Sequence, residues 1–303
     1  MRHLLLAAVL FGVCACGSGP SGSRADGGGK PPAGDASQAG DAGGHSGGDG
    51  GQAAVDGGEV VVESDAGEGA QDVGAYEGPA IVYGASADTL FRLDPTTKAV
   101  DVIGVFVGCA DVIDLALDKD STLWATTWDG LYKIDPSNAY CSRVAKGTYP
   151  NSLSFVPVGT VDPYSEALVG YDGATYVRIS TLSGSITRIG ELTGGFTSSG
   201  DIVSVKGGGT YLTVKGPGCN DCLFRVDPKT GDMVENLGPI HFADVFGLAY
   251  WAGKVYGFTD SGVLFEVSLE ANLPTTKIPV PNASAGLSFW GAGSTTSAPV
   301  GAR

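Results

Sequence analysis

Histidine and basic residues are scarce in this 303-residue chain, which has three histidines and 18 lysines and arginines against 33 acidic residues. His3 lies close to the N-terminus and His45 in a glycine-rich stretch, so only His241 belongs to a globular segment. A site with several histidine ligands is therefore excluded from that segment. The chain also lacks the basic surface that DNA or RNA binding requires, and we expect no nucleic-acid partner.

Long hydrophobic runs are missing as well, and the longest, at residues 4–13, is too short to span a membrane. It lies within "MRHLLLAAVLFGVCAC", which resembles a bacterial lipoprotein signal. In such signals a cysteine after a small residue is lipidated; Cys16 after Ala15 fits better than Cys14 after the bulky Val13. We expect residues 1–16 to be a signal peptide with Cys16 lipidated. The alternative is an ordinary secretory signal. The prediction implies an exported protein of the bacterial envelope, at the outer membrane or cell surface, with the lipid as its only membrane contact.

Aromatic residues are almost absent from residues 17–78, which hold 20 glycines and 11 acids. Such a composition cannot bury a core and is typical of disorder. The aspartates do not follow the repeat of calcium-binding β-rolls. We therefore interpret this segment as a flexible tether with a mean reach of roughly 45 Å.

From residue 80 onward the 3.6-residue apolar period of a helix is missing, and alternating apolar and polar residues are frequent. One short element recurs at intervals of 41, 45, 47 and 41 residues. Its copies are "LFRLD" ending at Asp94, "LYKID" at Asp135, "YVRIS" at Ser180, "LFRVD" at Asp227 and "LFEVS" at Ser268. This period predicts the four-stranded blades of a β-propeller. Three of the copies end in Asp followed by Pro, which favours a turn, so the repeat itself indicates architecture.

A second element precedes each copy after the first and occurs once more after the fifth copy, and it predicts the innermost strand of a blade. It reads "DLALD" at 114–118, "SLSFV" at 152–156, "DIVSV" at 201–205, "GLAYW" at 247–251 and "GLSFW" at 286–290. The first blade lacks such a strand, and the last copy follows a complete fifth blade. The sequence therefore predicts an all-β, five-bladed β-propeller over residues 79–291, closed by a C-terminal inner strand that completes the first blade. Residues 292–303 are expected to be a flexible tail.

The "LFRLDP" and "LFRVDP" elements and their spacing resemble the extracytoplasmic β-propeller repeat proteins related to the NHL and YVTN families. The resemblance covers the whole globular part. It implies a propeller that serves in binding, scaffolding or catalysis, because this fold alone does not determine function.

Four cysteines remain beyond the signal, an even number that predicts disulfides in an exported protein. Cys219 and Cys222 in "CNDC" are adjacent enough to pair, which leaves Cys109 with Cys141. A redox role for "CNDC" is the alternative, although such a pair normally begins a helix.

Polar residues near the starts of the inner strands are the candidate ligand-binding residues, because ligands of propellers bind at the central channel. They are Asp111, Asp114, Asn151, Asp201 and Asp244. The carboxylates could bind calcium, perform acid–base chemistry as in lactonase- or glycosidase-like propellers, or bond the backbone. Trp251 and Trp290, taken to end equivalent strands, could stack on sugars or pack between blades.

Nothing in the sequence forms a convincing nucleophile–base pair, so no catalytic residue is assigned. We expect a non-catalytic envelope lipoprotein that binds a protein or a glycan, with no cofactor except an optional calcium ion. The alternatives are a calcium-dependent hydrolase that uses the inner-strand aspartates and a scaffold for envelope assembly.

Overall fold

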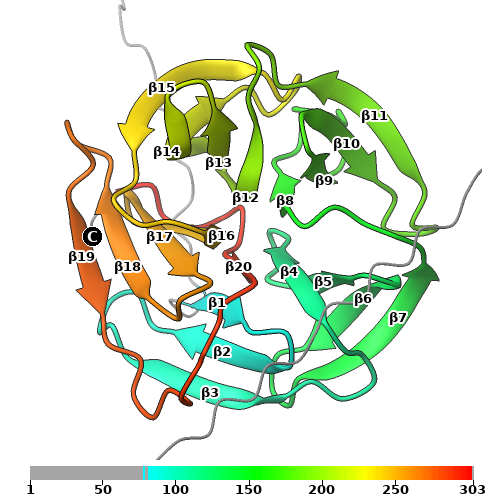
Figure 1. Cartoon of the computed structure of the whole chain (residues 1–303). Helices are drawn as coiled ribbons and strands as arrows, with labels where there is room; N and C mark the ends of the chain where they lie inside the picture. The colour runs from blue at the N-terminus through cyan, green and yellow to red at the C-terminus, as the bar shows by residue number, and fades with distance from the viewer. Residues whose placement is uncertain (1–77, 79–80, 302–303) are drawn as a thin grey trace, which may run out of the picture. The chain divides into compact units, whose positions relative to one another are not determined.

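The computed structural model describes Gly78 and residues 81–301. Every regular element in this part of the chain is a β-strand, and the strands form five four-stranded sheets around a central axis (Figure 1). The predicted five-bladed, all-β propeller is therefore confirmed. The described residues include no helix that is long and apolar enough to cross a membrane. Cys16, the rest of the predicted signal peptide and residues 17–77 of the predicted tether lie outside the described residues.

The strands of each blade pair antiparallel, from an inner strand at the axis to an outer strand at the rim. Blade one consists of β20 (Gly291–Gly293), β1 (Val82–Ala85), β2 (Thr89–Leu93) and β3 (Val100–Val105). Blade two consists of β4 (Val112–Leu117), β5 (Leu123–Thr127), β6 (Gly130–Asp135) and β7 (Tyr140–Lys146). Blade three consists of β8 (Leu153–Val156), β9 (Ala167–Asp172), β10 (Thr175–Ile179) and β11 (Ile186–Glu191).

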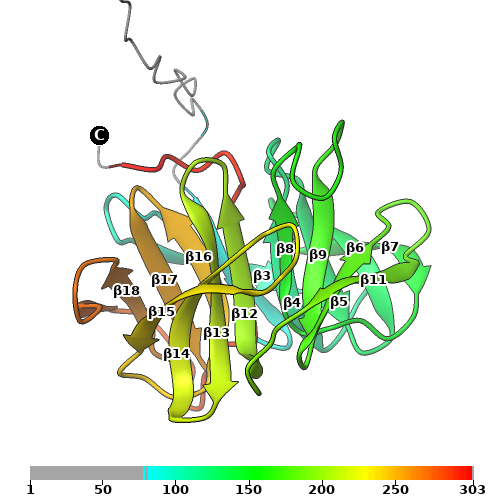
Figure 2. The same cartoon turned by 90° about the horizontal axis from the view of Figure 1, so that it is seen from above.

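The last two blades follow the same order. Blade four consists of β12 (Thr197–Val205), β13 (Gly209–Gly216), β14 (Cys219–Val226) and β15 (Met233–Pro239). Blade five consists of β16 (Val245–Trp251), β17 (Lys254–Thr259), β18 (Leu264–Ser268) and β19 (Thr275–Ile278). The turns gather on two opposite faces (Figure 2). We call the face where the inner strands begin the mouth face, and the opposite one the far face.

The ring closes where β20 pairs with β1, with Gly291 opposite Ala85 and Gly293 opposite Tyr83. This strand begins five residues after the predicted one, "GLSFW" at 286–290. The reason is steric, because a Cβ at residue 291 would lie 2.5 Å from Asp114 Oδ1 and one at residue 293 would lie 3.0 Å from the Leu115 carbonyl oxygen. Only small residues fit beside blade two, so the closing strand lacks the apolar pattern used to find it.

The segment after β20 is packed against the propeller, which corrects the expectation of a flexible tail from residue 292. Thr295 donates its hydroxyl hydrogen to the Asp118 carbonyl oxygen at 2.8 Å, and Lys206 N donates to the Thr296 carbonyl oxygen at 2.9 Å. Ala252 N donates to the Pro299 carbonyl oxygen at 2.7 Å. The segment, red in Figure 2, thus contacts blades two, four and five on the far face. The propeller therefore extends beyond its predicted end at residue 291.

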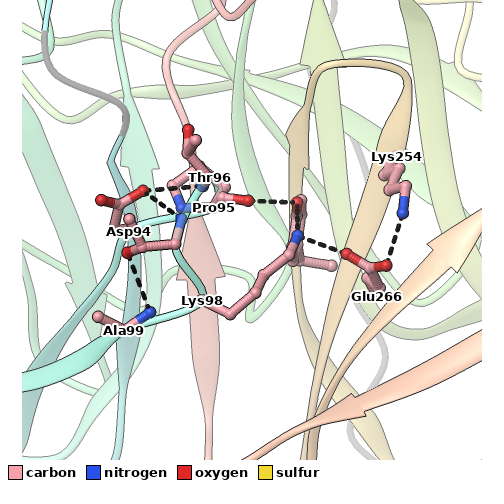
Figure 3. Close-up of polar contacts among 9 residues, drawn as sticks. Asp94, Pro95, Thr96, Lys98, Ala99, Lys254 and Glu266 are labelled. Carbon is pink, nitrogen blue, oxygen red and sulfur yellow. Dashed lines mark hydrogen bonds and ion pairs between the residues drawn. The ribbon is translucent and has the colours of Figure 1, made fainter. Parts of the chain in front are cut away.

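The repeated "LFRLDP" element ends in a turn that fastens one blade to another (Figure 3). The Asp94 carboxylate accepts hydrogen bonds from Thr96 N at 2.8 Å and Thr97 N at 3.1 Å, which builds the turn. Lys98 then donates to the Tyr256 hydroxyl of blade five at 2.8 Å and forms an ion pair with Glu266. The turn after "LFRVDP" is fastened in the same way, since the Pro228 carbonyl oxygen accepts a hydrogen bond from Tyr176 of blade three at 2.8 Å.

Both predicted disulfides are present. Cys109 bonds Cys141, which ties the loop after β3 to β7 and so joins blades one and two. Cys219 bonds Cys222 at the start of β14.

Candidate ligand-binding site at the channel mouth

Asp114 and Asp201 occupy corresponding positions near the starts of two inner strands. In blades five and one the same position is held by Gly247 and Gly291. The strand register shows this, because the next residue of each inner strand pairs with the same position of the second strand: Leu115 with Ala125, Leu248 with Gly257 and Ala292 with Gly84. Gly291 leaves space for the Asp114 side chain, because a Cβ there would lie 2.5 Å from Asp114 Oδ1, whereas a Cβ at Gly247 would meet Gly291 and Ala292 of the closing strand. Both aspartates are fully buried, with 0% exposure.

Asp201 is a hydrogen-bond acceptor for three blades. Its Oδ1 accepts from Ile202 N at 2.6 Å and Leu153 N at 3.3 Å, while its Oδ2 accepts from Leu248 N at 2.6 Å. Inner-strand N–H groups have no further strand to pair with at the axis, and a buried donor left without an acceptor costs about 1–3 kcal/mol. The carboxylate therefore stabilises the inner edges of blades three, four and five.

Asp114 has a different set of contacts. Its Oδ1 accepts from Leu115 N at 2.7 Å, whereas its Oδ2 receives no hydrogen bond from a donor group among the described residues. Burial, and then the charge of Asp201, raise the pKa of Asp114 well above its ordinary value. Burial also raises the pKa of Asp201, although hydrogen bonds from Asp114 and Leu248 N oppose the rise. Asp201 accepts hydrogen bonds from three backbone N–H groups and Asp114 from one, so we infer that Asp114 is the protonated partner and donates a hydrogen bond to the Asp201 carboxylate.

This geometry gives the carboxyl pair a structural role. A cation beside Asp201 would face three N–H donors, and no carboxylate oxygen of the pair is open to solvent. Calcium requires six or more oxygen ligands, so the residues present do not fit it. Within residues 81–301 no three acidic, cysteine or histidine side chains lie close enough together to hold a metal ion.

Asp111 and Asp244 also correspond to each other, but they lie in turns on the surface. Both have a positive φ, 53° and 55°, directly before a buried valine that begins an inner strand. Aspartate tolerates this left-handed conformation better than most residues do. Their shared position therefore reflects how the chain enters the inner strand, and Asp111 also lines a cavity.

A pocket of about 290 Å³ lies at the mouth of the channel, and we call it the mouth pocket. Three aromatic side chains and one aliphatic side chain line it together with one amide and one carboxylate. These residues are Trp128, Phe246, Trp290, Ile113, Asn151 and Asp260. Of the predicted candidates, Asn151 and Trp290 belong to this pocket. An apolar wall with a few polar groups is the usual composition of a small-molecule site.

Trp290 is held in place by a chain of hydrogen bonds. Its indole Nε1 donates to the Ser288 hydroxyl at 3.0 Å, and Ser288 donates to the Asp260 carboxylate. Its backbone N donates to the Ala85 carbonyl oxygen at 2.8 Å. The ring is therefore oriented in the absence of a ligand, which reduces the entropy lost on binding.

Trp251 lies elsewhere, so the predicted equivalence of the two tryptophans is wrong. It is the last residue of β16, at the far-face end, and is 6% exposed within the hydrophobic core. Trp290 directly precedes β20 and therefore corresponds to Phe246, which precedes the equivalent glycine of β16. The shifted register of the closing strand explains the error.

Trp128, Phe246, Asp260 and Ile113 were not found from the sequence. Trp128 has the clearest signal, because it stands in "TTWDG" at the tip of the β5–β6 turn, where a large apolar residue has no core to join. It is 57% exposed. Exposed apolar side chains that gather in one patch mark binding sites, and Trp128 lines the same pocket as Phe246 and Trp290.

No family model matches the sequence, and no curated protein is significantly similar to it. Solved structures do match, at low similarity. The hydrazine synthase of Kuenenia stuttgartiensis is 13% identical with a TM-score of 0.37, over 66% of this chain and 63% of that one. A chain of a nidogen/laminin complex is 9% identical with a TM-score of 0.47, over 70% of this chain and 97% of that one.

A third match is a symmetrical protein described as a product of de novo evolutionary emergence. It is 16% identical with a TM-score of 0.46, over 73% of this chain and 99% of that one. No residue, ligand or partner carries over to this chain at such similarity. The fold assignment rests on the strand topology of the five blades.

Proposed function

We propose that this protein is a non-catalytic binding protein of the bacterial envelope that holds a glycan at the mouth of its propeller channel. The observation that carries the proposal is the mouth pocket, with its exposed Trp128 and its oriented Trp290. The faces of a pyranose ring are covered by C–H groups that pack on an indole, while its hydroxyls point outward to polar groups. Asn151 and Asp260 supply such groups at the rim of this pocket.

The size of the pocket favours a glycan over a folded protein. A stable protein–protein interface buries about 800 Å² on each partner, over a broad surface. The mouth pocket is a concave space of about 290 Å³, which suits a small ring. A protein partner, as an assembly scaffold would need, is therefore the less favoured ligand.

The position of the chain in the propeller supports display of the mouth face. β1 runs antiparallel to β20 and ends at the mouth face, so the polypeptide enters the propeller on the far face. A lipid on Cys16 and a flexible tether would then leave the mouth pocket free to meet a ligand. The two disulfides agree with an exported protein.

The geometry gives no support to the alternative of a calcium-dependent hydrolase. The carboxyl pair is buried and bonded to backbone N–H groups, and His241 is exposed in the loop between β15 and β16. Neither group lies at the mouth pocket, whose one carboxylate, Asp260, accepts a hydrogen bond from Ser288.

Calorimetric titration of the full chain with cellotetraose and chitotetraose, two β-linked oligosaccharides, tests the proposal. We expect at least one to bind, and we expect Trp290→Ala to weaken it at least about tenfold, because a buried aromatic contact dominates such sites. The matched control is Tyr164→Ala, which removes an aromatic side chain that is 92% exposed on the far face. It should bind like the wild type.

Two results would count against the proposal. One is equal loss of binding in both variants, and the other is no heat of binding with either oligosaccharide while an envelope protein binds the mouth face. If Trp290→Ala does not fold, Trp128→Ala replaces it, because that side chain lies at a turn tip and is largely exposed.

A further inference from the structure

A second cavity, of about 490 Å³, lies beside the mouth pocket, and we call it the outer pocket. It is bounded by the loop of residues 108–111 and by Trp128, Asp129, Tyr132 and Arg143. Trp128 also lines the mouth pocket. One exposed indole therefore borders both cavities, so a single ligand could occupy both and contact this ring in each.

The outer pocket is more polar than the mouth pocket. Arg143 donates to the Asp129 carboxylate at 3.0 Å and to the Tyr132 hydroxyl at 2.8 Å, and Asp111 also lines the cavity. The cavity thus offers fixed donors and acceptors next to an aromatic ring. The two pockets together are lined by three carboxylates and one guanidinium, that of Arg143. This excess of negative charge disfavours an acidic ligand; the carboxylates are those of Asp111, Asp129 and Asp260.

The wall of the outer pocket is fixed before a ligand binds. The disulfide Cys109–Cys141 ties the loop to β7. Val107 N donates to the Ala139 carbonyl oxygen at 3.1 Å, and Cys141 N donates to the Val107 carbonyl oxygen at 2.8 Å. A cavity held open in this way loses little freedom on binding.

We infer that the mouth pocket and the outer pocket form one groove for a neutral, β-linked oligosaccharide of at least two sugar units. This inference rests on the proposed function and extends it. One unit occupies the mouth pocket between Trp128 and Trp290. The next contacts the other side of Trp128 and hydrogen-bonds to Arg143 and Asp129. Sugars whose ring substituents are equatorial fit best, since they present a flat C–H face to the indole.

The test compares glucose and N-acetylglucosamine with cellotetraose and chitotetraose, using the full chain. The wild type should bind the better tetrasaccharide at least about tenfold more tightly than its monosaccharide, because a second linked contact adds to the first. Arg143→Met keeps the packing on Tyr132 but removes the donors. It should bring the tetrasaccharide down to the affinity of the monosaccharide and leave the latter unchanged.

Arg178→Met is the matched control. Arg178 is as exposed as Arg143, at 39%, and also forms an ion pair with an aspartate, but it lies away from the groove in blade three. It should not alter binding. Tetragalacturonate, which is both acidic and α-linked, should bind at least about tenfold more weakly than the neutral β-linked chains.

The inference is overturned if Arg143→Met keeps the full gain of the tetrasaccharide, or if tetragalacturonate binds as well as the neutral chains. If Trp290→Ala still abolishes binding in that case, the proposed function stands and only the extended groove fails. If Trp290→Ala has no effect either, the proposed function fails with it.

Discussion

At the scale of single residues, Asp114 and Asp201 share burial and position but differ in their hydrogen bonds. Both oxygens of Asp201 accept hydrogen bonds from backbone N–H groups, while Asp114 Oδ2 receives none from the described residues. One aspartate therefore acts as an ionised acceptor, and the other as a proton donor. A carboxyl group that stays protonated when folded makes the native state bind more protons than the unfolded state does. Stability should then fall as the pH rises above about 3.9, the ordinary pKa of aspartate.

Asparagine substitutions distinguish the two roles. Asp114→Asn supplies a permanent donor to Asp201, so we expect equal or higher stability than the wild type at pH 8 and a flatter pH dependence. Asp201→Asn replaces one accepting oxygen by an NH2 donor that faces a buried N–H group, which should cost about 1–3 kcal/mol at every pH. Urea unfolding of the full chain at pH 4, 6 and 8 measures both effects. Similar losses in the two variants, with the pH profile of the wild type, would refute the assignment.

The position of these aspartates could be predicted from the repeats, but their surroundings could not. The alignment of "DLALD" with "DIVSV" correctly placed Asp114 and Asp201 in register. It could not show that Gly291 of blade one makes room for the Asp114 side chain at the axis. Contacts between blades depend on ring closure, which leaves no local pattern in the sequence.

At the scale of elements, the turns after the repeated motif hold neighbouring blades together through hydrogen bonds and an ion pair. Gly231 illustrates the constraint, because its φ is +71° and an added Cβ would lie 2.4 Å from the ring of Tyr176 in the preceding blade. Gly218 has nearly the same φ, +73°, and no heavy atom within 4 Å of such a Cβ. Comparing these two glycines separates the cost of backbone strain from the cost of disturbing the contact between blades three and four.

Alanine at each glycine tests this account. Gly218→Ala should lose about 1–2 kcal/mol of stability from the left-handed conformation alone. Gly231→Ala should lose that amount and about 1–3 kcal/mol more, because Tyr176 must move from a packed site. Chemical unfolding of both variants gives the comparison. Equal losses would mean that the turn does not depend on its contact with blade three.

The closing strand β20 lies five residues beyond its predicted position at 286–290. "GLSFW" has the pattern of an inner strand, whereas the true closing strand is Gly-Ala-Gly. Its small residues are required by the crowding from Asp114 and Leu115. An alternating apolar pattern identifies strands with large side chains in a hydrophobic core. It does not identify β20, because this strand consists only of glycine and alanine. That shift also moved Trp290 from the predicted end of a strand to the mouth of the channel.

At the scale of the whole molecule, the period of the repeats was enough to predict five blades. The two faces of the ring could not be predicted, because they depend on which turns gather together. The chain enters the propeller on the far face, and the segment after β20 packs there. The aromatic pocket and its neighbouring cavity lie on the mouth face. This division of the surface is the basis for proposing a displayed binding site.

The most direct test is ¹⁹F NMR of the full chain labelled with 5-fluorotryptophan and titrated with the tetrasaccharide that binds best. The chain has four tryptophans, of which Trp128 and Trp290 line the mouth pocket, while Trp124 and Trp251 are buried elsewhere. We predict that the resonances of Trp128 and Trp290 shift with the ligand and that those of Trp124 and Trp251 do not. Binding with unchanged Trp128 and Trp290 resonances would contradict the assignment of the channel mouth as the ligand site.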